Sequence, residues 1–155
     1  MKKLINPWVG LEGYQCFGCA PNNKMGLQME FYEDGEDIVA HWTPKEYHQG
    51  WLNTLHGGIQ SAIMDELAGW VVFRKLQTSG VTSRLNAKFL KSISVKEPFL
   101  EIRGRITEQK RNAVFIAVEI YNSAKELCSS AEIVYFASPK DVAREKFFFC
   151  ECKVE

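Results

Sequence analysis

Apolar and polar positions follow two different periods along this chain. Between Gly57 and about Gln77, apolar residues recur every three or four positions, which predicts a long helix. Apolar residues also continue around the helical cylinder, so we expect the helix to be buried on most sides. Before and after it, apolar residues alternate with polar ones, as they do in half-buried strands. The expected strands cover residues 27–31, 38–42, 81–90, 99–106, 114–120 and 131–137.

Short connections join these strands. A turn with Asp34-Gly35 at its centre makes a hairpin of the first two strands, and polar turns at 109–112 and 122–126 join the last three. Tight turns connect antiparallel neighbours, and the long helix is the element available to cover one face of the sheet. The sequence therefore predicts an α+β fold, with residues 1–25 as an irregular arm or short helix and 139–155 as a tail.

Length and charge restrict the classes of protein. The chain has 155 residues, the size of one domain, so we expect 1–155 to form a single unit. Lys and Arg number 19, and so do Asp and Glu, so no overall field attracts a nucleic acid. No uncharged apolar stretch reaches the ~20 residues of a membrane-spanning helix. The first residues resemble a secretory signal, but Asn6-Pro7 interrupts it. We expect a cytoplasmic protein without nucleic-acid or membrane partners.

The cysteines form two close pairs. Five cysteines is an odd number, which fits reduced thiols better than a disulfide framework. Cys16 and Cys19 make a C-x-x-C, and Cys150 and Cys152 make a C-x-C. Four thiolates in two pairs could form a tetrahedral zinc site if the fold brought the two ends together. The alternative, favoured by the unusual spacing of the second pair, is that all four are unlinked free thiols and no metal is bound.

His56-Gly57-Gly58 stands where the predicted helix begins. The first amides of a helix have no partner within the helix and carry partial positive charge. Glycines there allow another group to approach the main chain closely. The segment is therefore a candidate oxyanion site for a polarised carbonyl. The alternative is a tight turn from loop to helix with no chemical role.

Asp65 lies in the middle of the same helix, within an apolar stretch. Aspartate is a poor residue for a helix interior, and a buried carboxylate is costly unless it is paired or used. Either Asp65 or Glu66 could simply face solvent, but a carboxylate in an apolar cleft is a candidate general base or nucleophile. Asp65 lies nine residues after His56, roughly 13 Å along a helix. If both ends serve one site, they come from two subunits, so we expect a dimer.

These residues resemble those of a known family. His56-Gly57-Gly58 followed by Asp65, with a hairpin before and four strands after, resembles the hotdog-fold thioesterases, and is most similar to the phenylacetate-pathway-type acyl-CoA thioesterases. Cys16–Cys19 and His48-Gln49-Gly50 also resemble segments found there. The resemblance covers about residues 15–137. It implies an antiparallel sheet wrapped around one central helix, dimers and often tetramers, and hydrolysis of an acyl-CoA to a carboxylic acid and CoA without a cofactor.

The resemblance also implies roles for individual residues. The amide of Gly57, alone or with that of Gly58, would polarise the thioester carbonyl. Asp65 of the partner subunit would activate water or attack directly, and both mechanisms stay open. The hydroxyl of Thr82 would help hold the water, and His56 would orient the loop.

The chain departs from the family at two positions. Leu90-Lys91-Ser92 stands where relatives often have a proline after the basic residue, near the expected path of CoA. In some relatives an asparagine six residues before the histidine positions the water, and here Gly50 stands there. His48 and Asn53 are candidate substitutes. Three basic residues on or beside the following strand could contact CoA phosphates, or could be an ordinary solvated strand face. They are Arg84, Lys88 and Lys91.

Two other functions are compatible with the pattern. One is a hotdog dehydratase or hydratase acting on acyl thioesters, which the glycine pair directly after His56 disfavours. The other is a non-catalytic acyl-CoA binding protein, in which the carboxylate of Asp65 would have no purpose. A panel of saturated and unsaturated acyl thioesters would separate these possibilities.

Overall fold

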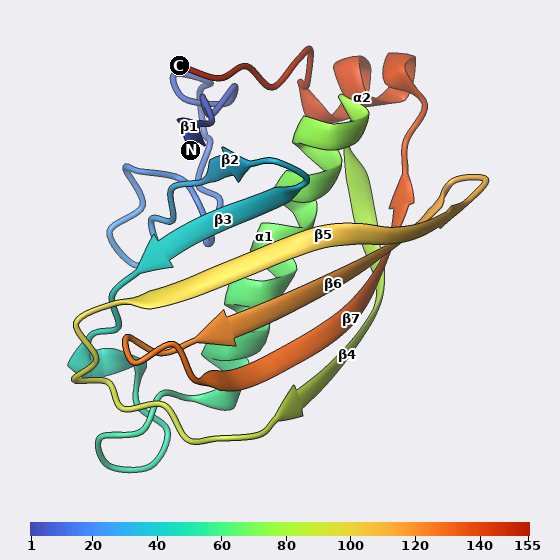
Figure 1. Ribbon diagram of the computed structural model, residues 1–155. Helices are drawn as coiled ribbons and strands as arrows, with labels where there is room; N and C mark the ends of the chain where they lie inside the picture. Colours follow the sequence, from blue (N-terminus) through green and yellow to red (C-terminus); the bar gives the residue numbers. More distant parts are fainter.

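A computed structural model describes residues 1–155. Its seven antiparallel strands form one curved sheet around the long helix α1 (Figure 1). The strand order is β1-β2-β3-β5-β6-β7-β4. The α+β prediction of a sheet around one central helix is confirmed. No helix combines the length and the apolar character needed to cross a bilayer. The elements are β1 (Lys2–Lys3), β2 (Tyr32–Asp34), β3 (Asp37–Trp42), a 3-10 turn (Glu46–His48), α1 (Gly57–Leu76), β4 (Gly80–Phe89), β5 (Leu100–Lys110), β6 (Ala113–Tyr121), β7 (Leu127–Ala137) and α2 (Lys140–Phe147).

Helix α1 lies directly on the sheet. Leu100 and Ile102 of β5 are fully buried against it, and Glu101 between them points away. At Gly104 a side chain would have no room, because a Cβ there would lie 2.5 Å from Cδ2 of Leu67 on the helix. Because Gly104 has no side chain, helix and sheet approach each other closely at this point. This gives the dense packing that is typical of protein interiors.

Strand β4 is one edge of the sheet. It pairs only with β7, and most of its residues are exposed. A bulge between Thr82 and Arg84 shifts the register by one residue. Bulges change which face each side chain occupies. Thr82 faces the helix before the bulge, Leu85 faces it afterwards, and Arg84 is directed to the outer face.

The predicted strand at residues 27–31 is wrong. Leu27, Met29 and Phe31 are buried and alternate with exposed residues, as the pattern indicated. However, Gln28 has a left-handed φ of 52°, and the segment bonds to the N-terminal arm instead of to β3. The amide of Leu27 donates to the carbonyl of Phe17 at 2.7 Å. The hairpin partner of β3 is the shorter β2.

The two ends of the chain lie together (Figure 1). Leu4 forms a bridge with Val154, and the short helix α2, which the sequence did not indicate, precedes the C-terminal segment. Trp8 of the arm contacts Trp70 of α1 and Phe149 of the tail, with ring centroids 6.2 and 5.7 Å away. Phe149 of the tail is buried by these contacts.

An ion-pair cluster joins the β2–β3 hairpin to the end of α1. Both oxygens of Glu33 accept from the guanidinium of Arg74 at 3.0 Å, and Lys75 donates to the same carboxylate at 2.8 Å. Arg74 also donates to the carbonyl of Cys152 in the tail. Hydrogen bonds from Arg74, the strongest influence, lower the pKa of Glu33 to about 2.

We predict that Glu33→Gln destabilises the protein by about 1–3 kcal/mol at neutral pH, the usual value of hydrogen bonds to a charged group. The folded-state pKa lies below the ordinary value of 4.5, so the stabilisation is present above that value and is lost as the pH falls to about 2. Urea unfolding across this range measures it. Glu36→Gln, in the exposed turn of the same hairpin, is the control, and equal losses in both variants would contradict the prediction.

Candidate active site

Two hydroxyl groups hold the carboxylate of Asp65. Oγ1 of Thr82 on β4 donates to Asp65 Oδ1 at 2.7 Å. The hydroxyl of Tyr135 on β7 donates to the Asp65 carbonyl at 2.9 Å and lies 3.4 Å from the same Oδ1. Burial, and then the charge of Asp65, raise the pKa of Tyr135, so this phenol stays protonated and remains a donor. The carboxylate is thus oriented in the middle of α1 and is only half-buried.

Sheet register and one glycine place these groups. Thr82 and Tyr135 are direct cross-strand partners, so their side chains share one face of the sheet. Gly69 lies one turn after Asp65 on α1, and a Cβ there would come within 3.1 Å of the Tyr135 hydroxyl. The small residue leaves room for the ring against the helix. Tyr135 is therefore a site residue that the sequence reasoning missed.

The first two amides of α1 differ in their hydrogen bonding. His56 is the N-cap, and its Nδ1 accepts from the amide of Gly58 at 2.8 Å. The amide of Gly58 is consequently occupied, which removes it as an oxyanion donor in this arrangement. The amide of Gly57 has no hydrogen-bond partner. Of the two expected donors, the structure leaves the amide of Gly57 available, and His56 caps the helix.

A cavity of about 460 Å³ opens beside Gly57. Main-chain and side-chain atoms of the preceding loop line it, including Gly50, Trp51 and His56. Several large apolar side chains around this end of the helix are exposed to solvent. They are Tyr47, Trp51 and Leu52 of the loop and Phe89 and Leu90 at the end of β4.

Gly57 and Asp65 belong to one uninterrupted helix. Eight residues at 1.5 Å each separate them by about 12 Å along its axis. A thioester carbonyl and the attacking oxygen lie within about 3–3.5 Å of each other when they react. Within one copy of the chain, these two groups therefore cannot act on the same carbonyl.

The other expected site residues occupy varied positions. His48 is buried, and its Nδ1 accepts from the amide of Lys45, so it supports its own loop. Asn53 is exposed with a φ of 61° and does not line the cavity beside Gly57. Neither side chain lines the cavity beside Gly50 and Gly57. Lys91 pairs with Glu126.

Arg84 and Lys88 lie on the outer face of β4. The bulge separates them from the face that carries Thr82, since Arg84 pairs with Val134 while Thr82 pairs with Tyr135. Both side chains are exposed and take part in no ion pair.

The cysteines do not assemble as one four-thiol group. The Sγ atoms of Cys16 and Cys19 lie 3.4 Å apart, and the third side chain close to both is Glu66 of α1. Cys150 is exposed and Cys152 is buried beside Gln77, so the C-x-C is not part of this cluster. The ends of the chain do meet, but through residues near Leu4 and Val154. The four-cysteine site, which the sequence left open as the less favoured possibility, is therefore not formed in this structure.

Cys16, Cys19 and Glu66 affect one another strongly. The Cys19 thiol donates to Cys16, which lowers the pKa of Cys16, while this bond and burial raise that of Cys19. Burial, and then the neighbouring Cys16, raise the pKa of Glu66 to about 7. The ligand atoms of all three side chains lie within 4.8 Å of one another, so they could hold a metal ion.

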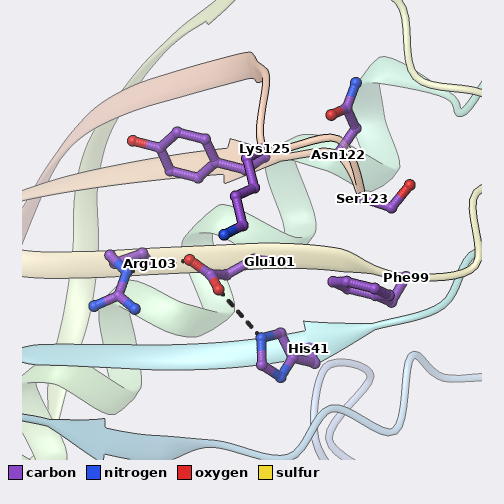
Figure 2. Close-up of a pocket in the computed structure, with 8 residues that line it drawn as sticks. His41, Phe99, Glu101, Arg103, Asn122, Ser123 and Lys125 are labelled. Carbon is purple, nitrogen blue, oxygen red and sulfur yellow. Dashed lines mark hydrogen bonds and ion pairs between the residues drawn. The ribbon is translucent and has the colours of Figure 1, made fainter.

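A second cavity lies on the face of the sheet opposite the helix (Figure 2). It measures about 580 Å³ and lies on the outer face of β3, β5 and β6 (Figure 2). Glu101 at its floor pairs with His41 at 3.3 Å and with Arg103. These side chains form ion pairs with one another. Neither Asp65 nor Gly57 lines this cavity on the outer face of the sheet. This cavity therefore does not include the candidate residues of α1.

Similarity to a known family extends over the part of the chain that contains α1. The family model of the thioesterase superfamily matches residues 52–129, half of the chain, from the loop before α1 into β7. Nothing among the curated proteins matches the sequence.

Solved structures share the fold. A thioesterase superfamily protein from Shewanella loihica PV-4 is 28% identical, with 72% of this chain and 91% of that chain covered and a TM-score of 0.60. A hypothetical thioesterase from Streptococcus pneumoniae TIGR4, solved with coenzyme A, is 22% identical over 72% and 90%, with a TM-score of 0.67. Variants of it carry alanine for an aspartate and for a threonine. A Streptococcus mutans UA159 protein bound to acetyl-CoA is 18% identical over 84% and 98%, with a TM-score of 0.69.

The N-cap role of His56 can be tested by stability. We predict that His56→Ala lowers the free energy of unfolding by about 0.5–2 kcal/mol, because the Gly58 amide loses its acceptor. His56→Asn should retain most of the stability, since asparagine is a strong N-cap residue. Urea unfolding of the two variants measures the difference. Equal stability of the alanine and asparagine variants would refute the capping role.

Proposed function

Because the chain belongs to the thioesterase superfamily, we propose that it hydrolyses an acyl-CoA thioester to a carboxylic acid and free CoA, at a site shared between two copies of the chain. The observation that carries this proposal is the arrangement on α1. A carboxylate held by two hydroxyls lies in the middle of the helix, and a free amide lies at its start. Together they provide a base or nucleophile and an oxyanion donor.

The reaction follows from these two groups. The thioester carbonyl oxygen accepts a hydrogen bond from the Gly57 amide. The partial positive charge of the helix start stabilises the negative charge that develops on this oxygen. Asp65 of the partner subunit removes a proton from a water that adds to the carbonyl carbon. The tetrahedral intermediate then collapses, the carbon–sulfur bond breaks, and the proton on Asp65 passes to the departing CoA sulfur. Direct attack by Asp65, with hydrolysis of the resulting anhydride, is the alternative route.

Thr82 and Tyr135 position the carboxylate in this scheme. Their hydroxyls bind the same oxygen, Oδ1, so the other oxygen of Asp65 is left for the water. The pneumococcal relative was studied with alanine in place of an aspartate and of a threonine, the residue types of the Asp65–Thr82 pair. This supports the assignment of both residues.

The edge of the sheet supports a dimer. Strand β4 has one unpaired side, and exposed edges are usually covered by another element or chain. Val81 and Phe89 on β4 are 50% and 54% exposed, and Phe136 on β7 is 43% exposed. A second copy placed along β4 would cover these side chains and bring its own α1 alongside. A dimer of dimers is the larger assembly that we propose.

The surroundings of Gly57 fit an acyl-CoA. The exposed apolar side chains around the helix start, Tyr47, Trp51, Leu52 and Phe89, can contact an acyl chain. The chain has no net charge, so CoA phosphates must be bound by local groups, for which the unpaired Arg84 and Lys88 are available. Two structural neighbours were solved with CoA or acetyl-CoA, which supports this ligand class.

We predict that the purified protein releases thiol from acyl-CoAs and that Asp65→Asn lowers kcat by about 10³-fold or more. The amide keeps the size of the side chain and its hydrogen bond from Thr82, but cannot take up the proton. A thiol-trapping assay over short, medium, long and aromatic acyl chains, with an enoyl thioester included, measures the rates. Asp141→Asn, on the exposed start of α2, is the matched control. Unchanged turnover in Asp65→Asn would eliminate the proposed role.

The Gly57 amide can be removed without disturbing the helix. Proline lacks the amide proton and is favoured at the first helical position, and His56 already has the extended conformation required before proline (φ −61°, ψ 133°). A Cβ at Gly57 would make ordinary contacts with Phe89 at 3.6 Å. We predict that Gly57→Pro lowers kcat by about 10²–10³-fold, whereas Gly57→Ala, which keeps the amide, changes it only a few-fold. Similar rates in both variants would exclude the amide as a donor.

Mixing the two inactive variants tests whether the site is shared. In a heterodimer of Gly57→Pro and Asp65→Asn chains, one site combines an intact amide with an intact carboxylate. Random exchange of subunits should therefore restore about one quarter of the wild-type rate. No recovery, despite subunit exchange shown by native mass spectrometry, would rule out a site formed between subunits.

A further inference from the structure

The N-terminal arm places two thiols against α1, next to the proposed catalytic carboxylate. The segment Cys16–Cys19 folds over the helix so that Cys16 Sγ lies 3.5 and 3.6 Å from the two carboxylate oxygens of Glu66. Cys19 Sγ lies 3.4 Å from Cys16 Sγ. Glu66 follows Asp65 directly on the helix, yet the proposed hydrolysis uses neither Glu66 nor the thiols.

We propose that Cys16, Cys19 and Glu66 bind one divalent cation of the zinc class, with water as the fourth ligand. In a tetrahedral zinc site, bonds of about 2.3 Å to sulfur and about 2.0 Å to oxygen place two sulfurs about 3.8 Å apart and a sulfur and an oxygen about 3.5 Å apart. The observed separations of 3.4 Å and 3.5 Å differ from these by a few tenths of an ångström at most. Cys16 is only half-buried, which gives water access to the remaining position.

No basic side chain pairs with this cluster. Two thiols and a carboxylate share one small volume, and no Lys, Arg or His forms an ion pair with Glu66. The donors that reach the cluster are neutral: Trp70 Nε1 lies 3.2 Å from Glu66 Oε1, and the Tyr14 hydroxyl lies 3.0 Å from Cys19 Sγ. A carboxylate is costly to bury in its charged form without a positive partner, and a divalent ion held by these three side chains would be that partner.

The loop between the cysteines is shaped for this contact. The backbone of Gly18 packs directly on the Glu66 carboxyl group, and a Cβ at Gly18 would lie 2.2 Å from Glu66 Cδ. Trp70 and Tyr14 hold the ligand side chains from outside, as partners of metal ligands usually do. The ion would fix the arm to α1 one residue from Asp65.

Cobalt titration of the reduced, metal-free full-length protein tests the site, with Zn²⁺ as competitor. We expect one Co²⁺ per chain and a thiolate-to-cobalt charge-transfer band that Zn²⁺ abolishes. Cys16→Ser, Cys19→Ser and Glu66→Gln should each weaken binding by more than about tenfold, and Gly18→Ala should weaken it by displacing Glu66. Cys150→Ser, at an exposed thiol outside the cluster, should bind as the wild type does.

A second measurement needs no substitution and is independent of folding defects in the variants. Zn²⁺ should slow alkylation of Cys16 and Cys19, mapped by mass spectrometry, and leave that of Cys150 unchanged. No saturable cobalt binding, binding that survives all three ligand substitutions, or a Cys16–Cys19 disulfide as the sole product under mild oxidation with no metal uptake after reduction would overturn the proposal. Thiol release from acyl-CoA is assayed separately, so failure of the metal site and failure of the thioesterase proposal are distinguishable.

Discussion

The burial of α1 within the sheet is the constraint on which the rest of the structure depends. Leu67, Ala68 and Trp70 in its middle are completely or almost completely buried, and Gly104 allows β5 to contact it without intervening atoms. A helix enclosed in this way is a rigid rod. The helix keeps the free Gly57 amide and the Asp65 carboxylate about 12 Å apart along its axis. Because of that separation, the proposed reaction needs a second subunit.

Features of the sheet position the carboxylate of Asp65 on α1. The bulge after Thr82 turns one hydroxyl toward the helix while later residues of β4 keep their outward charges. The missing side chain at Gly69 leaves space for Tyr135. A site built on a helix and two paired strands holds its groups more exactly than one built on loops, which is what transition-state stabilisation demands. The loop before α1 contributes a cavity and an N-cap instead.

Asp65 and Glu66 are adjacent in sequence, yet they have different partners. Consecutive helical residues point about 100° apart, so the two carboxylates meet different neighbours. Asp65 faces the hydroxyls of Thr82 and Tyr135, while Glu66 faces the thiols of the N-terminal arm. One helical turn can therefore serve the proposed hydrolysis on one side and the proposed metal site on the other.

Local patterns in the sequence determined much of this protein. The period of apolar residues located α1 within one residue of its end, short turns indicated antiparallel strands, and an aspartate in an apolar helix drew attention to Asp65. Only the tertiary structure decided which groups surround them. Tyr135 lies 70 residues from Asp65, and Cys16 lies 50 residues from Glu66. Such contacts depend on strand register, on a bulge and on the path of the arm, none of which leaves a periodic trace in the chain. The wrong prediction of a strand at residues 27–31 has the same cause. The alternation of apolar and polar residues correctly indicated burial, but it could not indicate which backbone segment supplies the hydrogen bonds.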